Sequence, residues 1–192
     1  MARISLAPRP SLVYRFVRWY SKRAYGRTMD PLKAMAHHPK ALWGTVRYEQ
    51  SIARWNTLDH ELKALAVMAS AAAIGCSWCM DFGYWKHHES GMDPRKLEDV
   101  PVWRESAVYT PLERDVLEYA EAVTTDPYAL DDSLADRLIG RLGEEAFVEL
   151  TMMVAVENLR SRFNAAVGLT SQGFKESCAL PRTGSERTPT SS

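Results

Sequence analysis

The chain has 192 residues, which is enough for one domain with a substantial core and too few for two ordinary domains and a linker. Its 24 lysines and arginines balance 24 aspartates and glutamates, so no net field draws nucleic acid or an anionic membrane surface. Apolar runs are far shorter than the roughly 20 residues that cross a bilayer, and the N-terminus lacks a charged leader followed by an apolar core. These features predict a soluble cytoplasmic protein with no membrane span and no nucleic-acid partner.

Three cysteines are too few for the disulfide framework of a small secreted fold. Two of them, Cys76 and Cys79, form a C-x-x-C motif, which in such a chain is typical of redox or metal chemistry. The third, Cys178, stands alone near the C-terminal tail, and we assign it no role.

The first predicted element, residues 11–25, is a basic amphipathic helix. Large side chains recur at helical spacing, with arginines elsewhere on the helical wheel; the predicted stripe is Leu12, Phe16, Trp19 and Arg23. We interpret it as a helix laid across its own domain or a neighbouring subunit; a membrane-surface or partner-binding arm is the alternative. We assign residues 1–29 to this segment, 30–178 to a helical domain and 179–192 to a disordered tail rich in Pro, Thr, Ser and Gly.

The domain is predicted to be all-α because helical periodicity runs through it with almost no strand-like alternation. After a turn at Pro39, a helix is expected over residues 40–55. Thr57 is predicted to cap the next helix, whose body, residues 62–74, is alanine-rich, apolar on nearly every side and therefore expected at the centre of the core. Further helices are predicted over residues 76–90, 110–123, 130–142 and 144–169.

The two cysteines lie at the start of the helix predicted over residues 76–90. Cysteines three residues apart in a first turn share one helix face, with their thiols in bonding reach. Cys76 lies nearest the positive end of the helix dipole, which lowers the pKa of its thiol and favours a nucleophilic thiolate. Cys79 would then resolve the sulfenic acid or mixed disulfide. Two inert core cysteines are the alternative.

A zinc site at the cysteine pair would need two further ligands, for which His87 and His88 are the obvious candidates. Adjacent helical residues point about 100° apart, so the two histidines can hardly complete one tetrahedral site with the cysteines. We therefore predict neither a metal nor an organic cofactor.

The segment from Gly75 to Gly83, following an alanine-rich helix, resembles the C-x-x-C segment of the carboxymuconolactone decarboxylase or alkylhydroperoxidase-like superfamily. The resemblance continues in Leu112-Glu113-Arg114, in residues 157–164 and in Gln172-Gly173-Phe174, and it covers about residues 30–175. It implies an all-α, alkylhydroperoxidase-like fold that assembles into homo-oligomers. For the peroxidase members, it implies reduction of hydroperoxides by the cysteine pair, which a thiol or lipoyl-carrying partner reduces again.

This chain departs from the peroxidase pattern in its proton relay. That pattern has a glutamate twelve residues before the first cysteine and a histidine four residues after the second; here the two positions hold Ala64 and Gly83. The cysteines carry over and the relay does not. Two small residues could instead let the helices before and after Gly75 pack closely. Peroxide turnover is expected to be slow unless another group supplies the proton.

Four residues are candidates for replacing the relay. Three of them also suit other roles: Glu61 as a first-turn partner of the helix dipole, Asp81 as an exposed or capping residue, and His87 as a polar residue near a helix end. The fourth, Glu157, follows a strongly apolar stretch, where a carboxylate must be paired or have a raised pKa.

The helical face of Glu157 also carries Arg160, Ser161 and Asn164. This row suits a catalytic base. It equally suits a buried ion pair that fixes helix register or an oligomer contact.

Three functions remain open. The leading hypothesis is a thiol-redox enzyme that reduces hydroperoxides or small disulfides through Cys76 and Cys79. The second is an enzyme resembling the decarboxylases of the superfamily, acting on a small lactone acid with acid–base groups such as Glu157 and without need of the cysteines. The third is a non-enzymatic, oligomeric redox sensor or scaffold.

Overall fold

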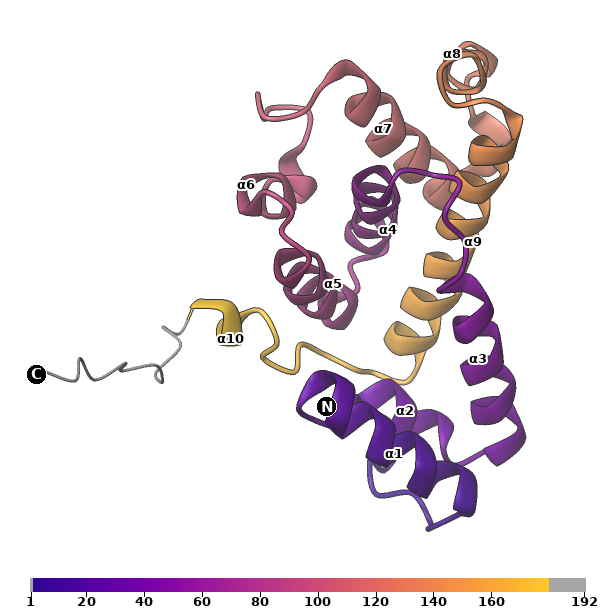
Figure 1. Ribbon diagram of the computed structural model, residues 1–192, viewed down its shortest axis with the longest axis vertical. Coiled ribbons are helices and arrows are strands. Elements are labelled where there is room, and N and C mark those ends of the chain that lie inside the picture. The colour runs from indigo at the N-terminus through magenta and orange to yellow at the C-terminus, as the bar shows by residue number, and fades with distance from the viewer. Residues whose placement is uncertain (1, 180–192) are drawn as a thin grey trace, which may run out of the picture.

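The computed structural model describes residues 2–179, and within them all regular structure is helical (Figure 1). The prediction of an all-α fold is therefore confirmed. All but the first residue of the predicted disordered tail lies outside the described residues. Between residues 2 and 179, no helix has both the length and the apolar character needed to cross a membrane.

The long helices match the predicted ones to within about three residues at each end. In chain order the elements are α1 (Leu12–Tyr25), α2 (Asp30–Met35), α3 (Pro39–Ile52), α4 (His60–Ile74), α5 (Ser77–Glu89), α6 (Pro94–Glu98), the 3-10 turn η1 (Val100–Val102), α7 (Pro111–Thr125), the 3-10 turn η2 (Pro127–Ala129), α8 (Asp132–Leu142), α9 (Glu144–Ala166) and α10 (Glu176–Ala179). The helix predicted to reach residue 169 stops earlier because Gly168 takes a left-handed φ of 73° and the Leu169 amide bonds back to the Asn164 carbonyl.

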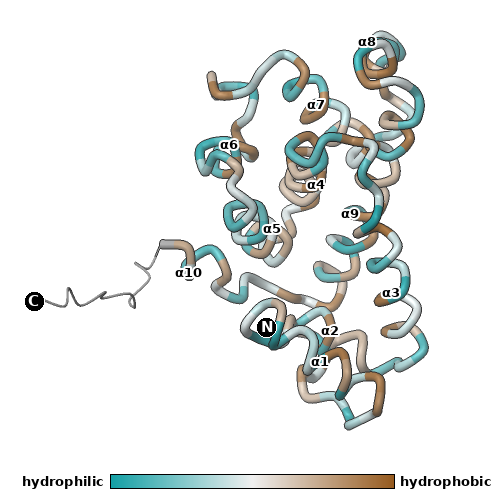
Figure 2. Tube along the Cα trace, viewed as in Figure 1, coloured by the Kyte–Doolittle hydropathy of each residue, from teal (hydrophilic) through white to brown (hydrophobic). Residues whose placement is uncertain are grey.

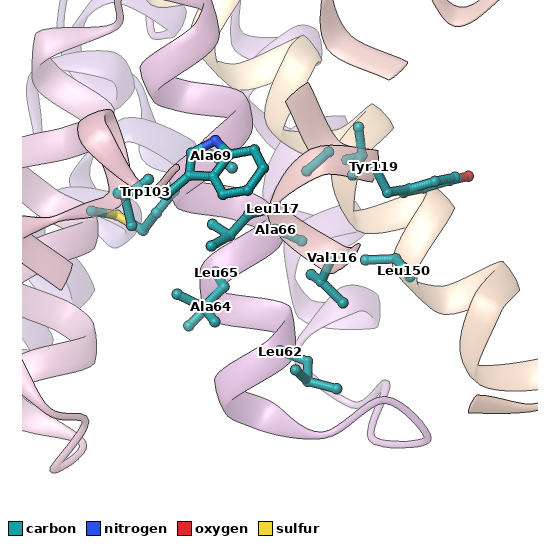
Figure 3. Close-up of a cluster of buried hydrophobic side chains, with 14 of the residues drawn as sticks. Leu62, Ala64, Leu65, Ala66, Ala69, Trp103, Val116, Leu117, Tyr119 and Leu150 are labelled. Carbon is teal, nitrogen blue, oxygen red and sulfur yellow. The ribbon is translucent and has the colours of Figure 1, made fainter. Parts of the chain in front are cut away.

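Helix α4 lies in the middle of the molecule, packed mainly against α5, α7 and α9 (Figure 1). Its tube turns from hydrophilic at the start to hydrophobic along the body (Figure 2). Figure 3 shows its side chains beside Val116 and Leu117 of α7 and Leu150 of α9, all of them buried. The prediction that this helix is central to the core is confirmed.

The cap predicted for α4 is wrong by two residues. Asp59, not Thr57, is the N-cap, and its Oδ1 accepts from the backbone N–H groups of Glu61 at 2.9 Å and Leu62 at 3.2 Å. The Thr57 N–H instead donates to Glu149 of α9 at 2.8 Å. The Glu149 carboxylate thus binds the chain just before α4, and the helix starts only at His60.

Helices α4 and α5 approach each other closely where α5 has no side chain. A Cβ added at Gly83 would overlap Sδ of Met68, which is 1% exposed, and Ala64 is also 1% exposed. Ala64 and Gly83, which stand at the relay positions of the peroxidase pattern, thus let α4 and α5 pack closely, as expected for two small residues.

Helix α1 packs on α2 and α3 with a face other than the stripe of Leu12, Phe16, Trp19 and Arg23. The side chains that it buries are Val17 and Ser21. Ser21 Oγ donates to the Arg27 carbonyl at 2.9 Å and accepts from the Met29 N–H at 3.2 Å, so this face also holds the loop that follows. The predicted stripe points outward, with Leu12 83%, Phe16 52% and Trp19 60% exposed.

Candidate functional site

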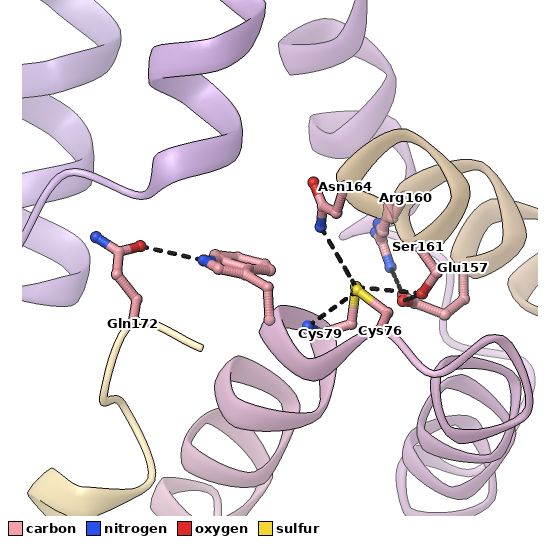
Figure 4. Close-up of a disulfide and its surroundings, with 8 residues drawn as sticks. Cys76, Cys79, Glu157, Arg160, Ser161, Asn164 and Gln172 are labelled. Carbon is pink, nitrogen blue, oxygen red and sulfur yellow. Dashed lines mark hydrogen bonds and ion pairs between the residues drawn. A yellow bond between two sulfur atoms is a disulfide. The ribbon is translucent and has the colours of Figure 1, made fainter. Parts of the chain in front are cut away.

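The turn between α4 and α5 places both cysteines at a helix start. Gly75 ends α4 with a φ of 78°, a left-handed conformation that reverses the chain direction. Cys76 is then the N-cap of α5, and its Sγ accepts from the backbone N–H of Cys79 at 3.2 Å. The two cysteines form a disulfide with their Cα atoms 5.3 Å apart, and they are only 3% and 7% exposed (Figure 4).

Helix α9 supplies two polar side chains to this disulfide. Ser161 Oγ lies 3.1 Å from Cys79 Sγ, and Asn164 Nδ2 lies 3.3 Å from the same sulfur (Figure 4). Both residues are buried. In the reduced state, the Asn164 amide stabilises negative charge on the Cys79 sulfur, and the Ser161 hydroxyl does so whenever its single proton points to the sulfur rather than to Glu157.

Glu157 lies one helical turn before Ser161 and is 3% exposed. Its Oε1 accepts from Ser161 Oγ at 2.7 Å, and Arg160 Nη1 lies 3.4 Å from its Oε2. Burial raises the pKa of Glu157 to about 7, although the charge of Arg160 and the bond from Ser161 act in the opposite direction. The carboxyl group can therefore both accept and release a proton near neutral pH.

Ser161 joins the carboxyl group to the sulfur. A hydroxyl has one proton to donate and two lone pairs, so it can accept a proton from the Cys79 thiol while it donates to ionised Glu157. With Glu157 protonated, the direction reverses. The 2.7 and 3.1 Å contacts thus form a continuous path for one proton between Glu157 and Cys79.

Arg160 ties this group to α3. Its Nε lies 2.8 Å from Oε1 of Glu49, and its Nη2 lies 2.5 Å from Oε2. This two-pronged contact fixes the guanidinium beside Glu157. The sequence left two roles open for Glu157, a buried ion pair and a candidate base. In the structure both belong to one network.

The other three candidate residues lie elsewhere. Glu61 forms an ion pair with Lys96, with its Oε2 3.2 Å from the lysine Nζ. Burial and the nearby charges of Lys86 and His60 lower the pKa of His87 to about 4, so its ring is neutral at pH 7. Neither has a side-chain bond to the cysteines among the described contacts.

Asp81 is buried, which contradicts the first of its two predicted roles, exposed or capping. Its carboxylate accepts three backbone N–H groups of the loop after α9, at 2.7 Å from Gln172, 3.1 Å from Phe174 and 2.7 Å from Lys175. Burial acts to raise the pKa of Asp81, but these three bonds outweigh it and the pKa is lowered. Asp81 therefore caps a remote loop, and Gln172 in that loop accepts from Trp78 of the motif at 3.1 Å.

Ser161 and Asn164 contact the disulfide, and the sequence assigned neither of them a role of its own. Their spacing from Glu157 puts all three on one face of α9, and this was the available signal. The spacing cannot predict that this face meets Cys79, which lies 82 residues earlier in the chain than Ser161.

The raised pKa of Glu157 has a consequence for stability that can be measured. Since its ordinary pKa is 4.5, the unfolded chain loses this proton at lower pH than the folded one. The contribution of Glu157 to stability is thus fully present below about pH 4.5 and is lost as the pH rises through about 7, by up to roughly 3 kcal/mol. The free energy of unfolding can be measured for the wild type and for Glu157→Gln in urea titrations. We expect the value of the variant minus that of the wild type to rise by up to roughly 3 kcal/mol between pH 5 and pH 8. A constant difference would mean that Glu157 titrates normally.

Comparison with known proteins gives two kinds of likeness. The model of the carboxymuconolactone decarboxylase family matches residues 39–122, which include both cysteines but end before α9. The uncharacterized protein YnjA of Escherichia coli is 30% identical over 171 residues, which cover 88% of this chain and 92% of YnjA.

Two solved structures share the fold at low identity. One is an alkylhydroperoxidase AhpD core, an uncharacterized peroxidase-related protein of Ralstonia eutropha, with a TM-score of 0.81, 17% identity and coverage of 94% of this chain and 98% of that one. The other is the debrominase Bmp8 in complex with 2,3,4-tribromopyrrole, with a TM-score of 0.78, 20% identity and coverage of 93% of this chain and 98% of that one.

Proposed function

We propose that this chain, which belongs to the carboxymuconolactone decarboxylase family, is a dithiol oxidoreductase that reduces small hydroperoxides through Cys76 and Cys79. The observation that carries the proposal is the path from Cys79 through Ser161 to Glu157, a carboxyl group with a pKa of about 7. A group with such a pKa is suited to move protons at neutral pH. It would take over the work of the relay that is absent at Ala64 and Gly83.

The first step is attack by the Cys76 thiolate on a hydroperoxide oxygen. The N–H of Cys79 and the start of α5 stabilise that thiolate. The oxygen–oxygen bond breaks, Cys76 becomes a sulfenic acid, and the departing alkoxide takes a proton from water to become the alcohol. The sulfur is oxidised by two electrons, and the hydroperoxide is reduced by two.

The second step closes the disulfide. Ionised Glu157 takes the thiol proton of Cys79 through Ser161, and the resulting thiolate attacks Sγ of Cys76. Hydroxide leaves and is protonated to water. Over both steps, two thiols and one hydroperoxide give one disulfide, one alcohol and one water.

An external dithiol must then reduce the disulfide for turnover to continue. Because both cysteines are under 10% exposed, a slender reductant is favoured over a protein surface. We propose a small thiol or a lipoyl-type arm. Cycling of this kind suits the reducing cytoplasm, where we place the protein.

We also propose that the chain forms a homo-oligomer. Besides the outward stripe of α1, helix α9 exposes Val148, Met152 and Leu159, of which Val148 and Leu159 are 60% and 59% exposed. Apolar rows of this kind on two helices favour association with further copies.

Reductive dehalogenation is a second candidate function. It is favoured by the likeness to the debrominase over nearly the whole of both chains. The electron balance suits the same pair: two thiols and one aryl bromide give one disulfide, one arene and hydrogen bromide. The thiolate would remove bromine from the ring carbon, and the ring carbon would gain a proton.

The experiment that tests the proposed function is a thiol titration of the fully reduced protein. One equivalent of tert-butyl hydroperoxide should lower the count from three thiols to one, with a disulfide between Cys76 and Cys79. Dihydrolipoamide should then sustain turnover. Cys178→Ser is the matched control and should still lose two thiols, whereas Cys76→Ser and Cys79→Ser should abolish disulfide formation and turnover.

Other outcomes would favour the alternatives. Disulfide formation without any turnover would indicate a redox sensor or scaffold. Decarboxylation of a lactone acid by a variant that lacks both cysteines would indicate the decarboxylase-like function. Bromide release from 2,3,4-tribromopyrrole, with no peroxide consumption, would assign the dithiol to dehalogenation.

A further inference from the structure

The far end of α5 holds a second cluster of reactive side chains, separate from the disulfide. It consists of His88 and Glu89 in the last turn of α5 and Cys178 in α10, which packs against α5. One ligand atom from each residue lies within 4.8 Å of the other two. The long side chain of Glu89 brings a carboxylate oxygen to the histidine although adjacent helical residues point about 100° apart.

We propose that His88, Glu89 and Cys178 bind a zinc ion. An imidazole nitrogen, a carboxylate oxygen and a thiolate are all established zinc ligands, at distances of about 2.0–2.3 Å. Such distances put tetrahedral ligands roughly 3.3–3.8 Å apart, so small side-chain rotations would close the trio around the ion. Binding displaces the thiol proton of Cys178 into solvent, and the metal keeps its charge throughout.

The surroundings of His88 support a ligand there. Its Nδ1 is buried and has no hydrogen-bond partner among the residues that the structure describes. The Tyr84 ring stacks on the imidazole, with ring centroids 5.8 Å apart, and so holds its orientation. A buried ring nitrogen without a partner costs free energy, and a zinc ion bound at Nδ1 would give this atom a partner and offset that cost.

Three protein ligands leave one position of a tetrahedral zinc ion for water or a small ligand. His88 and Cys178 both line a cavity of about 770 Å³ that extends along α5 past Tyr84 to Ser77. The proposed site thus lies beside a space large enough for a small molecule.

The test uses the oxidised protein, in which Cys76 and Cys79 are joined and Cys178 is the one remaining thiol of the chain. Titration with Co²⁺ should give one ion per chain and a sulfur-to-metal charge-transfer absorption, which Zn²⁺ then removes by displacement. Cys178→Ser should abolish the absorption, and His88→Ala should raise the dissociation constant at least about tenfold. His60→Ala, an exposed histidine outside the trio, is the matched control and should change nothing.

Independently of the spectrum, Zn²⁺ should protect Cys178 from alkylation by iodoacetamide in the oxidised protein. Absence of the charge-transfer absorption, or equal Co²⁺ affinity in His88→Ala, would overturn the proposal. Metal binding that occurs only after the Cys76–Cys79 disulfide is reduced would overturn it as well, because it would place the metal at the motif instead.

Discussion

Replacing Glu157 with glutamine should lower hydroperoxide turnover by about 10²–10⁴-fold, the usual contribution of a positioned acid or base. Glutamine keeps the size of the side chain and a hydrogen bond to Ser161, but it cannot accept or release the proton. In the wild type, the rate should rise with pH through about 7, because only the ionised carboxylate accepts the Cys79 proton. The variant should lose this rise. Stopped-flow peroxide consumption from pH 5 to pH 9 measures both effects.

Glu49→Gln is the matched control, because Glu49 shares Arg160 with Glu157 and has no bond to Ser161. It should reduce the rate far less and keep the rise with pH. Ser161→Ala interrupts the path itself and should resemble Glu157→Gln. If Glu157→Gln kept both the rate and its pH dependence, another group would have to accept the Cys79 proton, and His87 would be examined next.

The helices and the cysteine pair could be predicted from sequence because their signals are local. An alanine-rich run that is apolar on nearly every side located the central helix α4, and the spacing of Cys76 and Cys79 placed their sulfur atoms in bonding reach. The short helices α2 and α6 span six and five residues, so neither contains enough turns to show a periodicity.

Tertiary contacts decided the points at which sequence reasoning failed. The helical neighbours of Asp81 offer no partner, so the sequence leaves an exposed and a capping role open, and the partners that decide between them are backbone amides 91 to 94 residues away. The stripe of α1 is exposed, and hydrophobicity alone does not tell whether such a stripe meets α3 or a neighbouring subunit. Glu157 was identified by a different argument, the cost of burying a carboxylate, and only the fold connects it to Cys79.

Restoring the relay pattern of the peroxidase members, by Ala64→Glu with Gly83→His, should destabilise the fold by roughly 3–6 kcal/mol. A carboxylate at position 64 would enter a core that leaves Ala64 1% exposed, and an unpaired buried charge costs several kcal/mol. A side chain at position 83 would overlap Sδ of Met68, and overpacking of this kind adds about 1–3 kcal/mol. Since domains are stable by only about 5–15 kcal/mol, much of the protein should be unfolded in mild urea.

Single glycine substitutions separate overpacking from the general effect of adding a methyl group. Gly83→Ala should lower the free energy of unfolding by about 1–3 kcal/mol, because Met68 must move within a filled core. Gly44→Ala, at an exposed position in α3 with no atom near the new Cβ, should raise it by about 0.5–1 kcal/mol through helix propensity. Urea titrations at pH 7 give both values. A stable double variant with faster peroxide turnover would show instead that room for the relay exists, and that the path through Glu157 does not replace it.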